Sequence, residues 1–253
     1  MRIRLLFLLC FLFSASSISA TVRNVLIVVA MQEEAVPIID LLHLSPGPAL
    51  DEGLPMKTYV GHYANKQVAL VLNGKAPIPG VQNIGTQPAV LATYLGIHHF
   101  HPDIVLSIGT AGGRVDNGAK VDAIYTSDKI YFYARRMHSP EYQLYGAGGY
   151  PSMDTTDLIK KLNLKQATVC SSDSFEEDAT DREVMAKYGC VVIDMEAAGV
   201  AWVAMLKQVP MFAIKGITNY TGSTNAHDEF EKHYAEVTKK LAYTTRDTLD
   251  YLK

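Results

Sequence analysis

The sequence predicts a single α/β domain with a mostly parallel central sheet flanked by helices. Short apolar, β-rich runs alternate along the chain with helical patterns. The apolar runs are hydrophobic at nearly every position, which is typical of central strands covered on both faces. No repeat, low-complexity tract or linker interrupts the alternation, and a chain of 253 residues with 48% hydrophobic residues can bury one sizeable core.

The first twenty residues differ from the rest and predict a secretory signal peptide. Arg2 and Arg4 precede the apolar run Leu5–Phe13, and small residues follow at Ser14–Ala20. This order is typical of signal peptides, and the run is too short for a bilayer core of ~30 Å. We therefore expect an exported domain at residues 21–253, without a stable membrane anchor after cleavage. A disordered or membrane-tethered N-terminus is the alternative.

Strands and helices are expected in alternation after residue 20. The predicted strands are Val25–Val29, Val68–Leu72, Ile104–Ile108, Ala167–Cys170, Val191–Ile193 and Met211–Ile214. The predicted helices are Glu33–Leu42, Gln82–Leu95, Thr155–Leu162, Asp181–Lys187, Glu196–Lys207 and His227–Leu252. Segments 74–80 and 142–151 contain Gly and Pro and are predicted to be loops. The alternation favours parallel strand pairing.

Charge disfavours a nucleic-acid-binding protein, and the cysteines leave two possibilities, a disulfide or free thiols. The net charge is −3 and no basic run is present, so the sequence gives nucleic-acid binding no electrostatic support. Cys170 and Cys190 are the cysteines of the exported domain. Export would permit a disulfide between them. Each lies in or beside an apolar run, which favours two buried, unpaired thiols instead.

Polar residues follow several predicted strands directly. Open α/β sheets bind ligands beyond the carboxyl ends of their strands, so these residues are expected at one rim. They comprise two glutamate-containing segments, a Gly-rich turn and an amide-containing segment, at Ala30–Glu34, Asp194–Glu196, Gly109–Gly113 and Lys215–Asn219.

Two carboxylates at one rim suit the cleavage of a glycosidic bond. Breaking a C–N bond to ribose builds oxocarbenium charge on the sugar, as in glycoside hydrolysis. One carboxylate can activate a water and another can hold ribose hydroxyls, while a third polar group helps the base to leave. Glu33, Glu34 and Glu196 also have a structural explanation, because acidic residues favour helix N-termini.

Three motifs, taken together, resemble the nucleoside phosphorylase/nucleosidase superfamily. They are Val29–Ala35 (VAMQEEA), Ile108–Gly113 (IGTAGG) and Ile193–Ala198 (IDMEAA), in this order. Within the superfamily the chain looks most like 5′-methylthioadenosine/S-adenosylhomocysteine nucleosidases, and it shares Gly53–Pro55 and Arg135–Arg136 with the plant members. The resemblance spans residues 25–252. It implies the nucleoside phosphorylase fold, a homodimer whose neighbouring subunit helps to close the 5′ pocket, a small-molecule purine nucleoside as substrate, and no metal or organic cofactor.

The resemblance also implies residue roles. Glu34 matches the catalytic acid/base that activates water, and Glu196 matches the carboxylate that holds the ribose hydroxyls. Other matched positions contact the sugar, stack on the purine or read its edge; these are Met31, Met195, Thr110, Ala111, Gly112, Phe175 and Glu176.

The third catalytic position departs from the family pattern. Nucleosidases carry Asp after Ser or Thr where this chain has Thr218-Asn219. An amide can donate to a 6-oxo group but cannot relay a proton as a carboxylate does. Either the substrate is a 6-oxopurine nucleoside, or adenine cleavage is weak or absent. Asn219 also begins the sequon Asn219–Thr221, which is expected by chance because the residue should be partly buried.

The family comparison favours water over phosphate as nucleophile. Phosphorylases of the superfamily place arginines in loops that here are Met31–Ala35 and Leu106–Gly109, which contain no Arg or Lys. Two further departures, at Val121–Ile124 and Phe132–Arg136, leave the 5′ substituent open. The leading hypothesis is purine nucleoside hydrolysis. A non-catalytic exported nucleoside-binding or storage protein is the alternative, and a purine nucleoside phosphorylase the third.

Overall fold

The computed structural model describes residues 21–78, 80–137 and 139–253. The predicted signal peptide at residues 1–20 lies outside the described residues, so it remains a prediction. Within the described part, no helix is long and apolar enough to cross a membrane.

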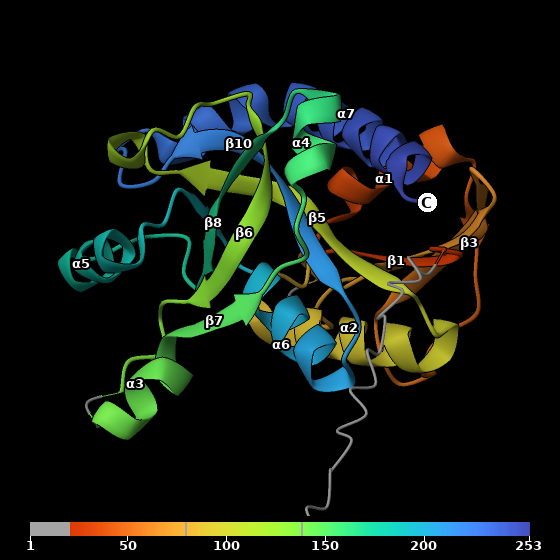
Figure 1. Cartoon of the computed structure of the whole chain (residues 1–253), viewed down its shortest axis with the longest axis horizontal. Helices are drawn as coiled ribbons and strands as arrows, with labels where there is room; N and C mark the ends of the chain where they lie inside the picture. Colours follow the sequence, from red (N-terminus) through yellow and green to blue (C-terminus); the bar gives the residue numbers. More distant parts are fainter. Residues whose placement is uncertain (1–20, 79, 138) are drawn as a thin grey trace, which may run out of the picture.

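The described residues form an α/β domain, as predicted (Figure 1). The strands are β1 (Asn24–Val29), β2 (Ser45–Pro46), β3 (Lys57–Tyr63), β4 (Lys66–Leu72), β5 (Ile104–Gly113), β6 (Ile124–Phe132), β7 (Gly148–Pro151), β8 (Lys165–Ser171), β9 (Val192–Asp194) and β10 (Met211–Tyr220). The helices are α1 (Gln32–Leu42), α2 (Thr86–Phe100), α3 (Pro140–Ala147), α4 (Thr156–Leu162), α5 (Ala179–Tyr188), α6 (Ala197–Lys207) and α7 (Ala226–Tyr251), with a 3₁₀ turn at Val115–Asn117.

The strands form one mixed sheet in the order β10-β6-β8-β9-β5-β1-β4-β3-β2, and β7 pairs with β6. The central pairs are parallel: β1 with β4 and β5, β5 with β10, and β8 with β6 and β9. Antiparallel pairs join β10 to β6 and β5 to β9. Because β10 pairs with both β6 and β5, the strands β5, β10, β6, β8 and β9 close into a ring, and β1, β4, β3 and β2 extend from it.

Helices cover both faces of the extended part of the sheet (Figure 1). On β1, Leu26 and Val28 belong to the core cluster that contains buried residues of α2 and α6. The alternate residues Val25, Ile27 and Val29 belong to the cluster that contains buried residues of α1 and α7. Period-two alternation with both faces apolar explains why the central strands are continuous hydrophobic runs in the sequence.

Two strands are longer than predicted, and they carry the candidate site. Gly109–Gly113 is not a turn after a strand but the second half of β5, and Thr218-Asn219 lies inside β10. The reason is pairing: Gly112 lies opposite both Asn219 of β10 and Ile193 of β9. The closing of the ring therefore extends β5 and β10 beyond their apolar runs.

The sequence patterns also missed β3, β6, β7 and α3. The segment predicted as a loop at 142–151 holds the end of α3 and all of β7. Polar residues interrupt the middle of β6, yet Thr126 and Ser127 are fully buried. Their hydroxyls pair with those of Thr155 and Ser152, at 2.9 and 2.8 Å, so burial costs them no hydrogen bond.

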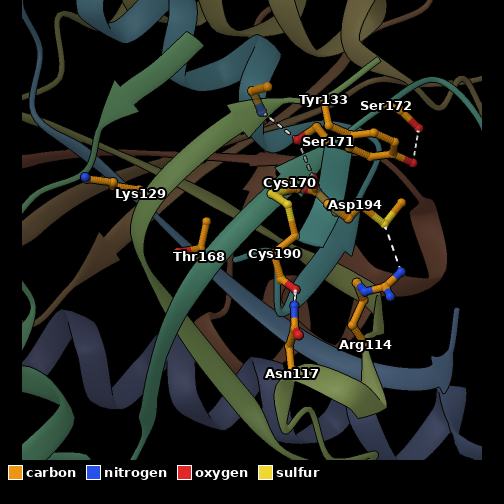
Figure 2. The surroundings of a disulfide bond; sticks show 12 residues. Arg114, Asn117, Lys129, Tyr133, Thr168, Cys170, Ser171, Ser172, Cys190 and Asp194 are labelled. Carbon is orange, nitrogen blue, oxygen red and sulfur yellow. Dashed lines mark hydrogen bonds between the residues drawn. A yellow bond between two sulfur atoms is a disulfide. The ribbon is translucent and has the colours of Figure 1, made fainter. Parts of the chain in front are cut away.

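The expectation of two unpaired thiols was wrong. Cys170 and Cys190 are fully buried and form a disulfide, with their Cα atoms 5.7 Å apart (Figure 2). Parallel pairing of β8 with β9 aligns Cys170 with Ile193 and brings the chain just before β9 alongside the end of β8. The two cysteines thus meet through a tertiary contact that their separate apolar surroundings do not reveal.

Candidate active site

A pocket of about 290 Å³ lies where β5, β9 and β10 end beside the first turns of α1 and α7. Nine of the ten predicted site residues line it: Met31, Glu34, Thr110, Ala111, Gly112, Phe175, Met195, Glu196 and Asn219. Glu176, which the resemblance matched for its backbone groups, is not among the lining residues. Its side chain is exposed, and its carbonyl accepts a hydrogen bond from the Ser174 hydroxyl at 2.6 Å. The walls also include Ile84, Ile193, Asp194, Thr218, His227 and Phe230.

Glu34 is held at the wall of the pocket by both of its carboxylate oxygens. Oε1 accepts from the backbone N–H and the hydroxyl of Thr110, at 2.6 and 2.7 Å. Oε2 accepts from the backbone N–H of Met31 at 3.2 Å, which caps α1. Gly109 allows this approach, since a Cβ there would lie 3.1 Å from Oε1. Burial raises the pKa of the Glu34 carboxyl, although the Thr110 contacts oppose the shift.

Glu196 directly precedes α6 and lines the same pocket as Glu34. Its Oε1 accepts a hydrogen bond from the backbone N–H of Gly85 at 3.0 Å, just before α2. Burial raises the pKa of Glu196 to about 7, against the lowering effect of Lys215 and with further raising by Asp194 and Glu34.

A buried lysine beneath the pocket was missed by the sequence analysis. Lys215 is 1% exposed, and its Nζ lies 2.8 Å from Oδ2 of Asp194. The same Oδ2 accepts from the backbone N–H of Ala197, and Oδ1 accepts from the Ser171 hydroxyl. The sequence contained a signal, because a lysine that directly continues an apolar strand is buried only if a carboxylate pairs with it.

Asn219 lies in β10 with 4% of its surface exposed, and its amide faces the pocket. Oδ1 accepts a hydrogen bond from the Thr218 hydroxyl at 2.9 Å. Nδ2 lies beside Gly112, at 3.5 Å from where a Cβ would stand, and remains available to a ligand. Because Asn219 is buried inside a strand, this structure leaves no room for a glycan on it, and the sequon stays a predicted chance match.

The mouth of the pocket is apolar and partly open. Phe175 is 54% exposed and lines the mouth with Ile84 and Phe230. An exposed aromatic face at a pocket mouth can stack on a planar ligand. His227 adds one titratable group to this wall.

The pocket has an anionic lining. Among the residues that the structure describes, no Arg or Lys lines it. Arg114, which follows β5, instead pairs with Glu177 and Asp116. In the same described ranges, no three His, Cys, Asp or Glu side chains are grouped to hold a metal ion. The site therefore offers carboxylates, backbone donors, one amide and the imidazole of His227.

Comparison with known proteins places this chain in a defined group. Residues 24–250 match the model of the phosphorylase superfamily. The chain is 34% identical over 237 residues to the 5′-methylthioadenosine/S-adenosylhomocysteine nucleosidase of Arabidopsis thaliana, covering 91% of this chain and 92% of that protein. It is 31% identical to the 5′-methylthioadenosine nucleosidase of the same plant, covering 94% and 90%. The structure of an Arabidopsis thaliana 5′-methylthioadenosine nucleosidase without ligand superposes with a TM-score of 0.89 at 30% identity, over 92% of this chain and 97% of that one.

Proposed function

The chain belongs to the phosphorylase superfamily, and we propose that it hydrolyses the N-glycosidic bond of a purine nucleoside. The observation that carries this proposal is the pair of glutamates, Glu34 and Glu196, in one pocket with raised pKa values. Two Arabidopsis thaliana relatives that are 34% and 31% identical over most of the chain are nucleosidases, which supports the reaction class.

In this proposal Glu34 activates the attacking water. A carboxylate with a raised pKa is a stronger base than one in water, so it takes a proton more readily as the water attacks the sugar. The two donors of Thr110 fix the orientation of Oε1 and leave Oε2 with one backbone partner. Oε2 is thus the oxygen with spare capacity to accept a proton from water.

Glu196 holds the ribose and stabilises its positive charge. As an ionised carboxylate it accepts hydrogen bonds from two hydroxyls and lies beside the developing oxocarbenium ion. Lys215 contributes by favouring the ionised form of Glu196. The same carboxylates disfavour a phosphate ion in the pocket, which supports water as the nucleophile.

Asn219 determines how the base leaves and which base is preferred. With Oδ1 accepting from Thr218, Nδ2 is a donor toward the pocket. A purine N7 or a 6-oxo group can accept from this amide, whereas a 6-amino group offers a donor in return. We therefore expect faster release of hypoxanthine or guanine than of adenine.

Assembly and location are proposed on separate grounds. Apolar side chains of α2 and α6, including Leu91, Tyr94 and Leu206, are exposed along one groove between the two helices. Such a surface supports a homodimer, which sedimentation of the purified chain would test. The disulfide supports export, because disulfides persist mainly in oxidising compartments. N-terminal sequencing of the mature protein tests cleavage near Ala20.

One assay tests the reaction. The purified chain is incubated with methylthioadenosine, adenosine, inosine and guanosine, with and without phosphate, and free base is followed. Base release without phosphate is the expected result. Release that requires phosphate would identify a phosphorylase. Tight nucleoside binding without any release would identify the binding or storage protein of the alternative hypothesis.

Two variants test the proposed part of Asn219. Asn219→Asp restores a carboxylate that accepts from a 6-amino group, so it should raise adenine release relative to hypoxanthine release. Asn219→Ala is the matched control and should lower the release of both bases. An unchanged ratio of adenine to hypoxanthine release in Asn219→Asp would contradict this role.

A further inference from the structure

We propose that the Cys170–Cys190 disulfide, together with the Arg114–Glu177 ion pair, is a positioning device for Phe175. The segment concerned is Ser172–Gly189, called here the stacking segment; it leaves the sheet after β8, carries Phe175, forms α5 and returns to β9. The inference rests on the proposed function, because it assigns the disulfide an effect on nucleoside affinity.

The stacking segment has few buried apolar side chains. In α5 only Asp181 and Met185 are buried, and Met185 belongs to a small apolar cluster around the disulfide, against which Val184 and Tyr188 pack. Phe175 is 54% exposed at the pocket mouth, so its own packing does not fix its position. In Figure 1, α5 projects from the ring of strands and lies outside the helical layers that cover the sheet. A segment of this kind is expected to open locally at low free energy unless other contacts hold it.

Its C-terminal end is held by the disulfide. Gly189 ends α5, and the next residue, Cys190, is bonded to Cys170 at the end of β8. The carbonyl of Cys190 accepts a hydrogen bond from Asn117 at 2.6 Å, which ties the same point to the turn after β5 (Figure 2). The disulfide therefore closes the base of the stacking segment.

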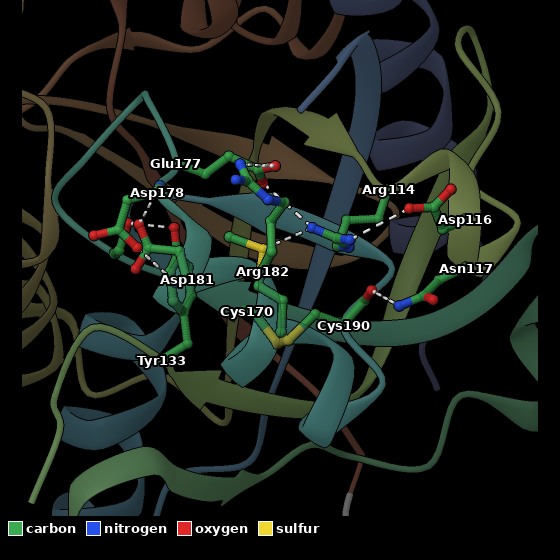
Figure 3. A network of polar contacts seen from close by, with 12 residues as sticks. Arg114, Asp116, Asn117, Tyr133, Cys170, Glu177, Asp178, Asp181, Arg182 and Cys190 are labelled. Atoms are coloured by element: carbon green, nitrogen blue, oxygen red, sulfur yellow. Dashed lines mark hydrogen bonds and ion pairs between the residues drawn. A yellow bond between two sulfur atoms is a disulfide. The ribbon is translucent and has the colours of Figure 1, made fainter. Parts of the chain in front are cut away.

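Its N-terminal end is held by polar contacts (Figure 3). Arg114 Nη1 lies 3.3 Å from Oε2 of Glu177, and both side chains are nearly buried. Arg136 pairs with Asp181 in the first turn of α5. Nearer to Phe175, the Ser172 hydroxyl donates to the hydroxyl of Tyr133 at 2.7 Å. These contacts and the disulfide hold the stacking segment at both ends.

The disulfide should act on Phe175 more than on Glu196. The end of β9 keeps its own supports when the disulfide is absent: Ser171 pairs with Asp194 in the parallel ladder, and the Ser171 hydroxyl also donates to Asp194. Glu196 follows on a helix that is buried along most of its length. Phe175 lies within the segment that the disulfide closes. Loss of the disulfide is therefore expected to weaken substrate binding while the bond-breaking step is retained.

The main test is a double-mutant cycle. Cys170→Ala/Cys190→Ala should raise the KM for the nucleoside roughly tenfold, within the loss expected when base stacking is removed. The value of kcat should stay within about twofold. In the Phe175→Ala background, removal of the disulfide should change KM no further, because the group that it positions is already gone. A disulfide with a merely structural role would lower Tm and leave KM unchanged, which would overturn the proposal.

A second measurement does not depend on turnover. Arg182 and Lys187 of α5 are exposed sites for trypsin. If the disulfide holds the stacking segment, its removal should accelerate cleavage at these two sites. Hypoxanthine, the expected product base, should slow that cleavage in the wild type when it is bound. Equal cleavage rates with and without the disulfide would overturn the proposal. A wild type that releases no base would instead count against the proposed function, while the cleavage result would still decide whether the disulfide holds the segment.

If the Cys170→Ala/Cys190→Ala variant fails to fold, reduction of the wild type provides the same comparison. Because both cysteines are buried, the wild type is unfolded in urea, reduced with a water-soluble phosphine and refolded without an oxidant. The phosphine is oxidised to its oxide with the oxygen of a water, and each sulfur takes up a proton, so two thiols per chain are gained and can be counted. Trypsin cleavage and hypoxanthine affinity are then compared between this protein and protein refolded with its disulfide intact. Glu177→Gln, which weakens the other end of the segment without touching sulfur, should shift both readouts in the same direction. If neither treatment shifts them, the proposal fails.

Discussion

The stacking segment and α6 both bring groups to the pocket, but different forces hold them. In α6, buried residues occupy most of the first eight positions: Ala197, Ala198, Gly199, Val200, Ala201, Val203 and Ala204. In α5 only Asp181 and Met185 are buried. α6 is held by close apolar packing. The stacking segment is held by a disulfide, ion pairs and side-chain hydrogen bonds, and by a smaller apolar cluster that includes Met185.

This difference separates two tasks of the site. Glu196, at the start of α6, needs a fixed position, because charge stabilisation depends on preorganised groups. Phe175 contributes by stacking, which needs its ring at the pocket mouth but no preorganised charge. The comparison indicates that rigid packing serves bond cleavage, while covalent and polar contacts hold the group that binds the base.

The largest expected effect is on base release and concerns Glu196, which precedes the closely packed helix α6. Glu196→Gln keeps the shape of the side chain but removes the charge that stabilises the ribosyl cation. We expect base release to fall roughly 10²- to 10⁴-fold. Single-turnover measurement of free base checks this. Glu183→Gln is the matched control, since Glu183 is exposed on α5 outside the pocket. Retained turnover in Glu196→Gln would remove Glu196 from the mechanism.

The next largest effect is on stability and concerns the Arg114–Glu177 ion pair of the stacking segment. Arg114→Met leaves the Glu177 carboxylate, whose side chain is 6% exposed, without its buried cation. Breaking such a pair should lower the free energy of unfolding by roughly 3 kcal/mol, because a buried charge is left poorly compensated. Urea unfolding followed by circular dichroism measures it.

The matched control is the exposed partner of the same carboxylate. Arg182 lies 3.6 Å from Glu177 and is 51% exposed. Arg182→Gln should cost less than about 1 kcal/mol, as is usual for solvent-exposed ion pairs. Equal losses in the two variants would mean that burial does not distinguish these contacts.

The raised pKa of Glu196 predicts a pH dependence of stability. The carboxyl has a pKa of about 7 in the folded protein and 4.5 as its ordinary value. Above pH 4.5 the unfolded chain loses this proton while the folded chain keeps it, so the folded state loses relative stability as pH rises toward 7. The wild type should lose up to roughly 3 kcal/mol relative to Glu196→Gln over this window. Urea midpoints of both proteins at pH 4.5, 6 and 8 test this; parallel curves would show that the carboxyl titrates normally.

The smallest effect tests the close packing of α6. A Cβ on Gly199 would lie 2.7 Å from the carbonyl oxygen of Thr86 at the start of α2. Gly199→Ala should therefore cost roughly 1–3 kcal/mol of unfolding free energy, since two helix backbones must separate. In Gly53→Ala the new methyl meets only an exposed Asp51 carboxylate at 3.3 Å, so this control should change stability by less than about 0.5 kcal/mol. Thermal unfolding compares them.

Much of the fold was predictable because the central strands are buried on both faces. Continuous apolar runs located β1, β4, β5, β8, β9 and β10, and helical patterns located α1, α2, α4, α5, α6 and α7. β6 was not predicted, because Thr126 and Ser127 at its centre are polar and are buried with hydroxyl partners from distant segments. Those partners are distant in the sequence, so the local pattern around β6 does not reveal them.

Site residues that belong to sequence motifs were predictable. Features of the site that depend on strand pairing or on an ion pair were not. Glu34, Thr110 and Glu196 were located by motif and order, and all three line the pocket. The role of Lys215 depends on Asp194, which lies on another strand. The extension of β5 to Gly113 depends on pairing with β10 and β9. Such contacts join residues far apart in the chain, so local pattern does not specify them.

The sequence by itself determined the α/β class, the buried strands and the residue types available for chemistry, because periodicity and polarity are local properties. Only the tertiary structure decided that Cys170 and Cys190 pair, that Asn219 is held inside a strand with its amide toward the pocket, and that Lys215 forms a buried ion pair with Asp194. The physical reason is that disulfides, buried ion pairs and hydrogen bonds require specific distances between distant segments. Those distances are set by strand register and helix packing across the whole domain.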